Sequence, residues 1–289
     1  MSQFQEELRA FSTAIERELE TRELAFPTVL ELSTRIRQAA YDPDISVQQI
    51  ADLIRIEPVV SARVVQMANS VVFRPGGGAL VTGVPSAIAR VGLLNVRTIA
   101  LVVAMDQLSE EKSSRPMRER AKLVWRHALD TGAWAYAFAR QRRRDLADAA
   151  LFAGLLTQMG ELYLLARVGR YPAVAEDLLA FAEISQFWSA AVCSTILTKL
   201  DLPPEIVEAA VETSTPQPAV TAWPPASAVA AISLARLIAE PEIAFDPRKR
   251  TERTAALDRL RERALEPSLD ALVERVAPQR DEILAVLRA

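Results

Sequence analysis

The 289-residue chain is half hydrophobic by composition, so it can bury a sizeable core in one large domain or two smaller ones. Its 34 basic and 37 acidic residues give a net charge of −3, which excludes a chain-wide field that attracts nucleic acid or an anionic membrane. The sequence shows no apolar leader and no run of about 18 uncharged apolar residues, so we expect a cytoplasmic protein without a membrane span.

Apolar residues recur at spacings of three and four along almost the whole chain, which predicts an all-α protein. We expect a first helix within residues 1–23 and several short helices in residues 24–110. Ser46 is a suitable N-cap for the helix that follows it, and Pro58 fits the first turn of the next helix. Gly92 marks a turn before a very apolar helix that must be central to a core.

Longer helices are predicted in the second half of the chain. One ends near Arg143, and another runs from Asp145 through "ADAALFAGLLTQMGELYLLARV". Two more helices meet at the prolines of residues 203–204, and a further helix covers "ASAVAAISLARLIAE". We expect the charged segment 241–289 to form helices that either pack on the core or mediate self-association, for example as a homodimer.

Few side chains are of the types that catalysis requires. His127 is the only histidine, which excludes a site with several imidazole ligands, and the acids lie mostly on polar helix faces rather than on one inward surface. Cys193 is the only cysteine and lies in an apolar run, where a small buried hydrophobe fits better than a nucleophile. No Gly-Lys-Ser/Thr follows the glycine-rich "RPGGGALVTG", so no phosphate-binding loop is indicated. We expect no metal and no cofactor.

Two arginine-rich clusters, residues 140–144 and 248–250, have the charge that nucleic-acid binding needs. Neither cluster is interleaved with aromatic residues, and the chain as a whole is acidic. For the first cluster, a solvated helix end is the favoured interpretation, because cations stabilise the C-terminal end of the helix dipole. Nucleic acid is therefore a disfavoured partner.

Several short motifs follow one another in an order and spacing that resembles the HDOD domain, the HD-related output domain of bacterial signalling proteins. They are Phe26-Pro27, Asp42-Pro43-Asp44, Glu57-Pro58, "MANS" at 67–70, "AIARVGL" and "WRHAL". The resemblance covers residues 24–240 and implies an HD-like helical bundle. It divides that region into an N-terminal helical lobe, residues 24–110, and a degenerate HD-like lobe, residues 111–240.

The resemblance also implies a degenerate metal site. Its positions are held by His127, Thr157, Gln158, Glu161, Ser189 and Thr213. The segment "GLLTQMGEL" looks like the family's "GLLHDIGKL", so that Thr157 and Gln158 replace the His-Asp pair and Glu161 replaces the lysine. His127 looks like the first histidine of the HD superfamily, whereas Ser189 and Thr213 stand where many relatives keep histidines. HDOD domains in general are regarded as lacking hydrolase activity, so we expect the scaffold to be kept for binding.

These observations predict a non-catalytic signal-transduction module that contacts other signalling proteins. The turn and cap residues of the N-terminal lobe fix several short helices, so we expect the partner surface there, with Arg55, Glu57 and Arg63 as exposed members. Two alternatives stay open. One is a residual phosphohydrolase or nucleotide-binding pocket around His127, and the other is a nucleic-acid-associated regulator that uses the arginine clusters.

Overall fold

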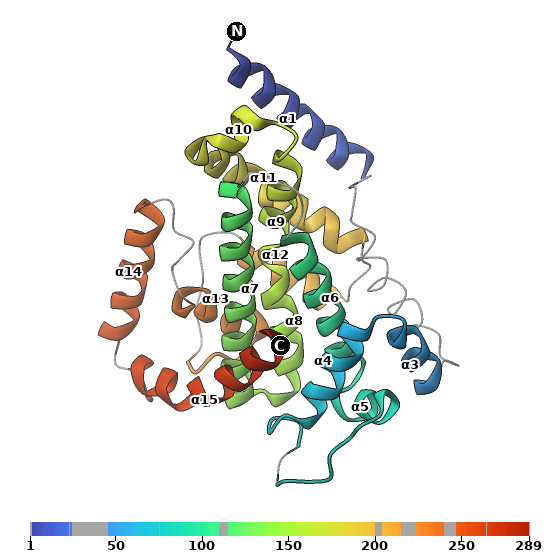
Figure 1. The fold of residues 1–289 in the computed structure, drawn as a ribbon. Helices are drawn as coiled ribbons and strands as arrows, with labels where there is room; N and C mark the ends of the chain where they lie inside the picture. The colour runs from blue at the N-terminus through green and yellow to red at the C-terminus, as the bar shows by residue number, and fades with distance from the viewer. Residues whose placement is uncertain are drawn as a thin grey trace.

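Helices form all the regular structure in the part of the chain that the computed structural model describes, so the all-α prediction is confirmed. That part comprises residues 2–22, 24, 46–74, 76–109, 115–199, 204–214, 223–239, 247–263 and 265–288. Figure 1 shows the long helix α7 at the centre, with the N-terminal lobe at its lower right and the C-terminal helices at its lower left. The motif residues at 26–27 and 42–44 lie outside the described residues.

The first elements are α1 (Gln3–Thr21), α3 (Val47–Arg55), α4 (Pro58–Asn69), α5 (Val84–Val91) and α6 (Leu93–Ser109). The HD-like lobe holds α7 (Arg115–Arg142), the short 3₁₀ helix η1 (Arg144–Leu146), α8 (Ala147–Leu156), α9 (Met159–Val168), α10 (Pro172–Glu176), α11 (Leu178–Lys199), α12 (Pro204–Ser214) and α13 (Ala228–Ile238). The last two helices are α14 (Pro247–Glu262) and α15 (Leu269–Arg288).

Local signals fix the short helices of the N-terminal lobe. Ser46 and Gln49 form a capping box at the start of α3, because each side chain accepts a hydrogen bond from the backbone N–H of the other, at 3.2 and 2.8 Å. Pro58 occupies the first turn of α4. Gly92 takes a φ of 80° after α5, and the axes of α5 and α6 differ by 110° there. The predicted cap, the proline position and the turn are confirmed.

The loop between α4 and α5 is tied at its base. The Asn69 side-chain amide donates to the Val81 carbonyl at 2.7 Å and accepts from the Val81 N–H at 2.9 Å. Arg90 donates to two further backbone carbonyls at the base of the loop, at 3.2 and 3.0 Å. Gly76 and Gly77 turn the chain with φ values of 79° and 75°, which residues with a side chain rarely adopt. The glycines therefore form a defined turn between two anchored ends.

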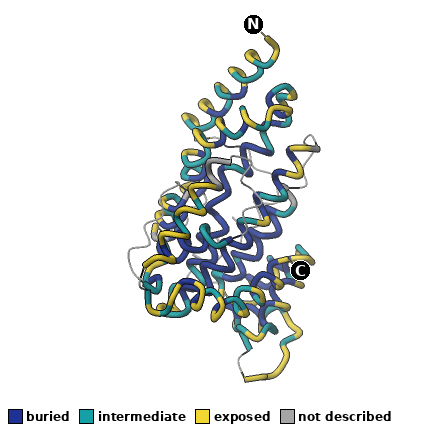
Figure 2. Tube along the Cα trace, turned by 90° about the vertical axis from the view of Figure 1, so that its left-hand side faces the viewer, coloured by how far each residue is buried: buried dark blue, intermediate teal, exposed yellow. Residues whose placement is uncertain are grey.

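The centre of the core is α7, which packs against α8, α13 and α15. Figure 2 shows the buried residues concentrated along the helices in the middle of the molecule. At the crossing of α7 and α8, a Cβ on Gly154 would lie 2.9 Å from the Cα of Gly132, so the two backbones meet where neither residue has a side chain. Residues Arg144–Val168 are apolar enough to cross a membrane, but 83% of the most apolar window is buried inside the molecule, as in a core helix.

The predicted single helix from Asp145 through Val168 is wrong, because the chain breaks into η1, α8 and α9. The main break lies at Thr157 and Gln158. Thr157 ends α8 and its hydroxyl donates to the Gly154 carbonyl at 2.8 Å, while Gln158, with φ −100° and ψ 4°, begins α9. The apolar pattern continues through this corner without a proline, so periodicity alone did not reveal it.

Two carboxylates attach the first helix, α1, to the HD-like lobe. Glu7 accepts a hydrogen bond from the Ala173 N–H of α10 at 2.7 Å. Glu18 forms an ion pair with Arg167 and accepts a hydrogen bond from the Tyr163 hydroxyl at 2.6 Å. Phe11 is fully buried and its ring centroid lies 5.2 Å from that of Tyr171. The amphipathic face of α1 thus packs against α10 and α11.

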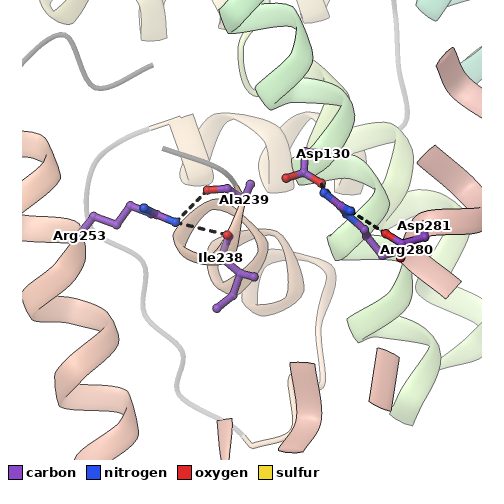
Figure 3. A network of polar contacts seen from close by, with 6 residues as sticks. All are labelled: Asp130, Ile238, Ala239, Arg253, Arg280 and Asp281. Atoms are coloured by element: carbon purple, nitrogen blue, oxygen red, sulfur yellow. Dashed lines mark hydrogen bonds and ion pairs between the residues drawn. The ribbon is translucent and has the colours of Figure 1, made fainter. Parts of the chain in front are cut away.

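Two arginines join the C-terminal helices to the rest of the molecule (Figure 3). Arg280 of α15 forms an ion pair with Asp130 of α7 and with Asp281, at 2.6 Å for the latter. Its guanidinium also lies 5.2 Å from the ring centroid of Trp134. Arg253 of α14 donates to three carbonyl oxygens at the C-terminal end of α13, at 2.7, 3.3 and 2.9 Å. The described part of segment 241–289 therefore packs on the core.

Arg63 is not exposed, contrary to the prediction. Only 8% of its surface is accessible, because it lies on the core-facing side of α4 between Val60 and Met67. Its guanidinium donates to the Leu287 carbonyl of α15 at 3.2 Å and to the Asp106 carboxylate of α6 at 3.1 Å. Arg63 thus joins the N-terminal lobe to the last helix and cannot belong to an exposed partner surface.

Candidate functional site

The α8–α9 corner carries the two residues that stand in place of the His-Asp pair. Thr157 and Gln158 are 6% and 8% exposed. The Thr157 hydroxyl is directed to the backbone of its own helix, where it donates to the Gly154 carbonyl. Within the described part of the chain, the Gln158 side-chain amide makes no hydrogen bond. The corner therefore offers one satisfied hydroxyl and one amide with hydrogen-bonding capacity left.

Helix α11 lies directly against this corner. A Cβ on Gly160 would overlap the Ser189 carbonyl oxygen, so the backbones of α9 and α11 are in contact. The Ser189 hydroxyl lies 2.9 Å from that of Ser185, one turn earlier on the same helix. One turn later, the buried Cys193 thiol donates to the Leu156 carbonyl at 3.4 Å, at the end of α8. This confirms the prediction that Cys193 is a small buried residue.

Thr213 and His127 lie on two helices that both pack on α8. Thr213 is buried on α12, which packs on α8, and its hydroxyl donates to the Ala209 carbonyl at 2.6 Å. His127 is half-buried on α7, which packs on both α8 and α9. The fold thus gathers the helices that carry the predicted residues, while the hydroxyls of Thr157, Ser189 and Thr213 are engaged within their own helices.

Glu161 has a charged partner. Its carboxylate accepts from Arg120 of α7 at 2.8 Å, and the two side chains are 17% and 6% exposed. Arg120 also lies over the Phe181 ring, 5.4 Å from its centroid. Since seven residues are close to two helical turns, Arg120 and His127 share one face of α7. The ion pair therefore joins α7 to α9 on the face that carries His127.

A second arginine in this region was missed by the sequence analysis. Arg236 is partly exposed on α13, and burial lowers the pKa of its guanidinium, an effect offset in part by Glu161 and Cys193. Within the described part of the chain, Arg236 forms no ion pair and no hydrogen bond. Its signal in the sequence was visible, because Arg236 is the only charged residue of the apolar helix α13.

These residues do not fit a catalytic metal centre. In the ranges that the structure describes, no three His, Cys, Asp or Glu side chains gather as the ligands of a metal ion would. Among the positions expected to hold ligands, His127 alone keeps a histidine. The others carry two threonines, a glutamine and a serine, and the nearby Glu161 is paired with Arg120. No metal-dependent step is therefore assigned to this site.

The family model of the HDOD domain matches residues 26–216, which is more than half of the chain. The chain belongs to the HDOD family. No curated protein matches it. Among solved structures, it is similar to a candidate metal-dependent phosphohydrolase from Shewanella amazonensis SB2B, with 22% identity, a TM-score of 0.74, and coverage of 99% of this chain and 100% of the other.

Two further solved structures are similar over nearly the whole chain. One is an HDOD domain protein of unknown function from Geobacter sulfurreducens, with 18% identity, a TM-score of 0.58, and coverage of 95% of this chain and 96% of the other. The other is described as a candidate signal transduction protein from Marinobacter aquaeolei VT8, with 19% identity, a TM-score of 0.56, and coverage of 100% and 67%. These likenesses confirm the predicted HD-like helical bundle.

The α3–α4 surface of this HDOD protein, defined by Arg55, Ile56, Glu57 and Val59, is where the structure places two of the three expected partner residues. Arg55 is exposed and pairs with Asp52 at 2.6 Å, and Glu57 is half-buried at the corner. Two apolar neighbours, Ile56 and Val59, are 63% and 49% exposed. Sequence analysis overlooked these apolar residues, whose exposure depends on how α3 and α4 meet.

The first arginine cluster of this HDOD protein is largely engaged in the fold. Arg140 donates to the Tyr136 hydroxyl at 3.0 Å, and Arg143 pairs with Asp145 at 2.8 Å. Arg142 donates to a backbone carbonyl at 3.5 Å. The side chains at 248–250 lie outside the described residues. The contacts of the first cluster fit the structural interpretation of that helix end.

Proposed function

We propose that this HDOD protein is a non-catalytic regulatory module of cytoplasmic signal transduction that contacts other signalling proteins through its N-terminal lobe. The observation that carries this proposal is the state of the former metal site. Thr157, Ser189 and Thr213 direct their hydroxyls to their own helices, and Glu161 is neutralised by Arg120. Such a site contributes packing, and it lacks the ligands that would activate a water molecule. The similar Marinobacter protein, described as a candidate signal transduction protein, supports the same setting.

The α3–α4 surface supports the protein-contact part of the proposal. Protein interfaces combine an apolar centre with a polar rim, and Ile56 and Val59 are exposed apolar side chains beside the charged Arg55 and Glu57. The junction of α3 and α4 is held in place by the Ser46 capping box, by Pro58, and by the buried Arg63 on the core-facing side of α4. A partner would therefore meet a surface that needs little ordering on binding.

Metal content and hydrolysis test the non-catalytic part. The purified, untagged protein should contain no stoichiometric Mn, Fe, Zn or Ni by elemental analysis, because too few ligands remain. Phosphodiester and nucleotide substrates should show no turnover above a protein-free control. Stoichiometric metal that is lost in His127→Ala would contradict the proposal.

Affinity capture from the native cells tests the partner surface. Ile56→Asp and Val59→Asp should abolish recovery of the partner, because a charge in the apolar centre of an interface is costly to desolvate. The matched control is Leu179→Asp, which places the same charge on an apolar residue of α11 that is 69% exposed. The double variant Thr157→Leu and Gln158→Leu should keep the partner. Loss of the partner only in that double variant would show that the α8–α9 corner, and not the α3–α4 surface, mediates the contact.

A further inference from the structure

Helix α11 exposes a long surface without charge. Residues 184–198 contain no Asp, Glu, Lys, Arg or His, although a quarter of the whole chain is charged. One side of this run packs on α9, whereas Phe187 on the outer side is 72% exposed, and Ala191 and Thr198 are exposed as well. The outer face of a surface helix normally carries charged residues, and a helix without them is normally buried. The exposed side of α11 therefore has the composition of a covered face.

Four residues on this side form the α11 seam, defined as Phe187, Ala191, Ser194 and Thr198. Their spacings of four, three and four residues are those of the a and d positions of a coiled coil, which lie along one side of a helix. The Phe187 ring stands edge-on to the Trp188 ring, with the centroids 4.7 Å apart. The seam thus presents one aromatic side chain followed by three short ones, and short side chains allow a second helix to approach closely.

The threonine hydroxyls on this side are already hydrogen-bonded. Thr195 donates to the Ala191 carbonyl at 2.9 Å, and Thr198 donates to the Ser194 carbonyl at 2.8 Å, each one turn earlier in α11. The main cost of burying a hydroxyl is the loss of its hydrogen bond, and these two hydroxyls would keep theirs. Another helix could therefore cover the seam without leaving either hydroxyl unbonded.

We propose that the α11 seam joins two copies of this chain, whose α11 helices pair antiparallel across a two-fold axis. In this register Ala191 of one copy lies against Ser194 of the other, and Phe187 lies against Thr198. Two-fold dimers form through such self-complementary surfaces, in which the same residues serve on both sides. The exposed Phe187 ring is buried at each end of the interface.

The charges at the ends of the run favour this arrangement. In the sequence the run lies between Glu183 and Lys199, so its two ends differ in sign. Antiparallel pairing brings the acidic end of one run to the basic end of the other, whereas parallel pairing would bring like charges together. An uncharged seam also offers no attraction to the phosphates of nucleic acid or of an anionic membrane. A second copy of the chain is therefore the occupant that matches the seam in both shape and charge.

This interface is independent of the α3–α4 surface. The seam lies on one helix of the HD-like lobe, and none of its residues belongs to α3 or α4. A dimer would carry two α3–α4 surfaces, one on each copy. Failure of either proposal leaves the other standing, because one is tested by the mass of the purified protein and the other by capture of a different protein.

Sedimentation velocity of the full-length protein over a range of concentrations tests the seam. The unsubstituted protein should sediment with twice the mass of a single chain. Ala191→Arg should raise the dissociation constant of the dimer by about tenfold or more, because each arginine would be buried against the opposite helix. The matched control is Leu179→Arg, which places the same residue on α11 outside the seam, at a position that is 69% exposed, and should remain a dimer. Far-ultraviolet circular dichroism checks that both variants stay helical.

Cysteine cross-linking tests the direction of the pair without disrupting it. Cys193, the only cysteine of the chain, is buried, so Ala191→Cys and Thr198→Cys each add one exposed thiol. Antiparallel pairing places the two copies of position 191 beside the two-fold axis and separates the two copies of position 198 by roughly 16 Å along the helix. A short bismaleimide should therefore link Ala191→Cys and leave Thr198→Cys unlinked. A monomer at every concentration, a dimer that Ala191→Arg leaves intact, or linking of Thr198→Cys in place of Ala191→Cys would each refute the proposal.

Discussion

Gly160 is the residue at which the packing of the site is tightest. An alanine there would place a methyl group on the Ser189 carbonyl oxygen, so α9 and α11 would have to separate. We expect Gly160→Ala to lower the free energy of unfolding by roughly 2 to 4 kcal/mol, measured by urea denaturation. Gly78→Ala is the control, because its Cβ would meet only an arginine side chain at 3.9 Å. Equal effects of the two substitutions would contradict close contact between α9 and α11.

Asp148 should make stability depend on pH. Burial raises its pKa above the ordinary value of 3.8, and the Asn95 amide and the Arg140 charge offset part of that rise. Because the folded state binds this proton more tightly than the unfolded chain, protonation favours the fold at pH values below 3.8. This contribution to stability is lost as the pH rises through the pKa that Asp148 has in the folded state. We therefore expect Asp148→Asn to raise the melting temperature at pH 7, with a smaller gain at pH 4.

The control for Asp148 has the opposite sign. Asp145 is fully exposed, and the hydrogen bond from Arg143 lowers its pKa. A lowered pKa stabilises the fold at pH values above the ordinary pKa of the carboxyl group. Asp145→Asn should therefore slightly lower the melting temperature at pH 7. A gain for both substitutions would indicate a general effect of negative charge and not the burial of Asp148.

At the scale of helices, the contact of α15 with α7 depends on the ion pair between Arg280 and Asp130. Asp130 is almost fully buried, so Arg280→Met would remove the cation beside a buried carboxylate. We expect a loss of roughly 3 kcal/mol in the free energy of unfolding, and partial recovery in the double variant with Asp130→Leu. Arg261→Met, which breaks exposed ion pairs of α14, should cost less than about 1 kcal/mol. Denaturation curves of the unsubstituted protein, Arg280→Met, the double variant and Arg261→Met measure these losses in the free energy of unfolding.

The positions of the helices could be predicted from local sequence signals, whereas the contacts between helices could not. Ser46, Pro58 and Gly92 act within one turn of their own position, so the sequence alone located the helix boundaries beside them. The break at Thr157 has no proline, and threonines within continuous helices, such as Thr98, also bond to the preceding turn, so this residue does not mark a break. Arg63 lies at helical spacing from Val60 and Met67, a signal for the core face that charge alone concealed. Its partner Leu287 is 224 residues away, beyond any local pattern.

At the scale of the whole molecule, the two terminal helices differ in importance. Helix α15 contributes several buried residues to the core and bonds to both lobes, whereas α1 buries Phe11 and Ile15 and packs on α10 and α11 of the HD-like lobe. We expect deletion of residues 265–289 to abolish cooperative unfolding, because apolar surface on α4 and α7 would be uncovered. Deletion of residues 1–23 should lower the melting temperature but keep a cooperative transition. Calorimetry and near-ultraviolet circular dichroism distinguish the two outcomes.

The bonds that α15 makes to α4 and to the loop after it also order events during synthesis. The Leu287 carbonyl accepts from Arg63, and Glu282 accepts from the Val72 N–H at 3.0 Å, across 210 residues of sequence. At about 5 to 20 residues per second, a ribosome needs roughly 10 to 40 s to make the intervening chain. During that interval the core-facing side of α4 has left the ribosome without the helix that covers it. The nascent protein is therefore most exposed to aggregation and proteolysis, and most in need of chaperones, until its last helix emerges.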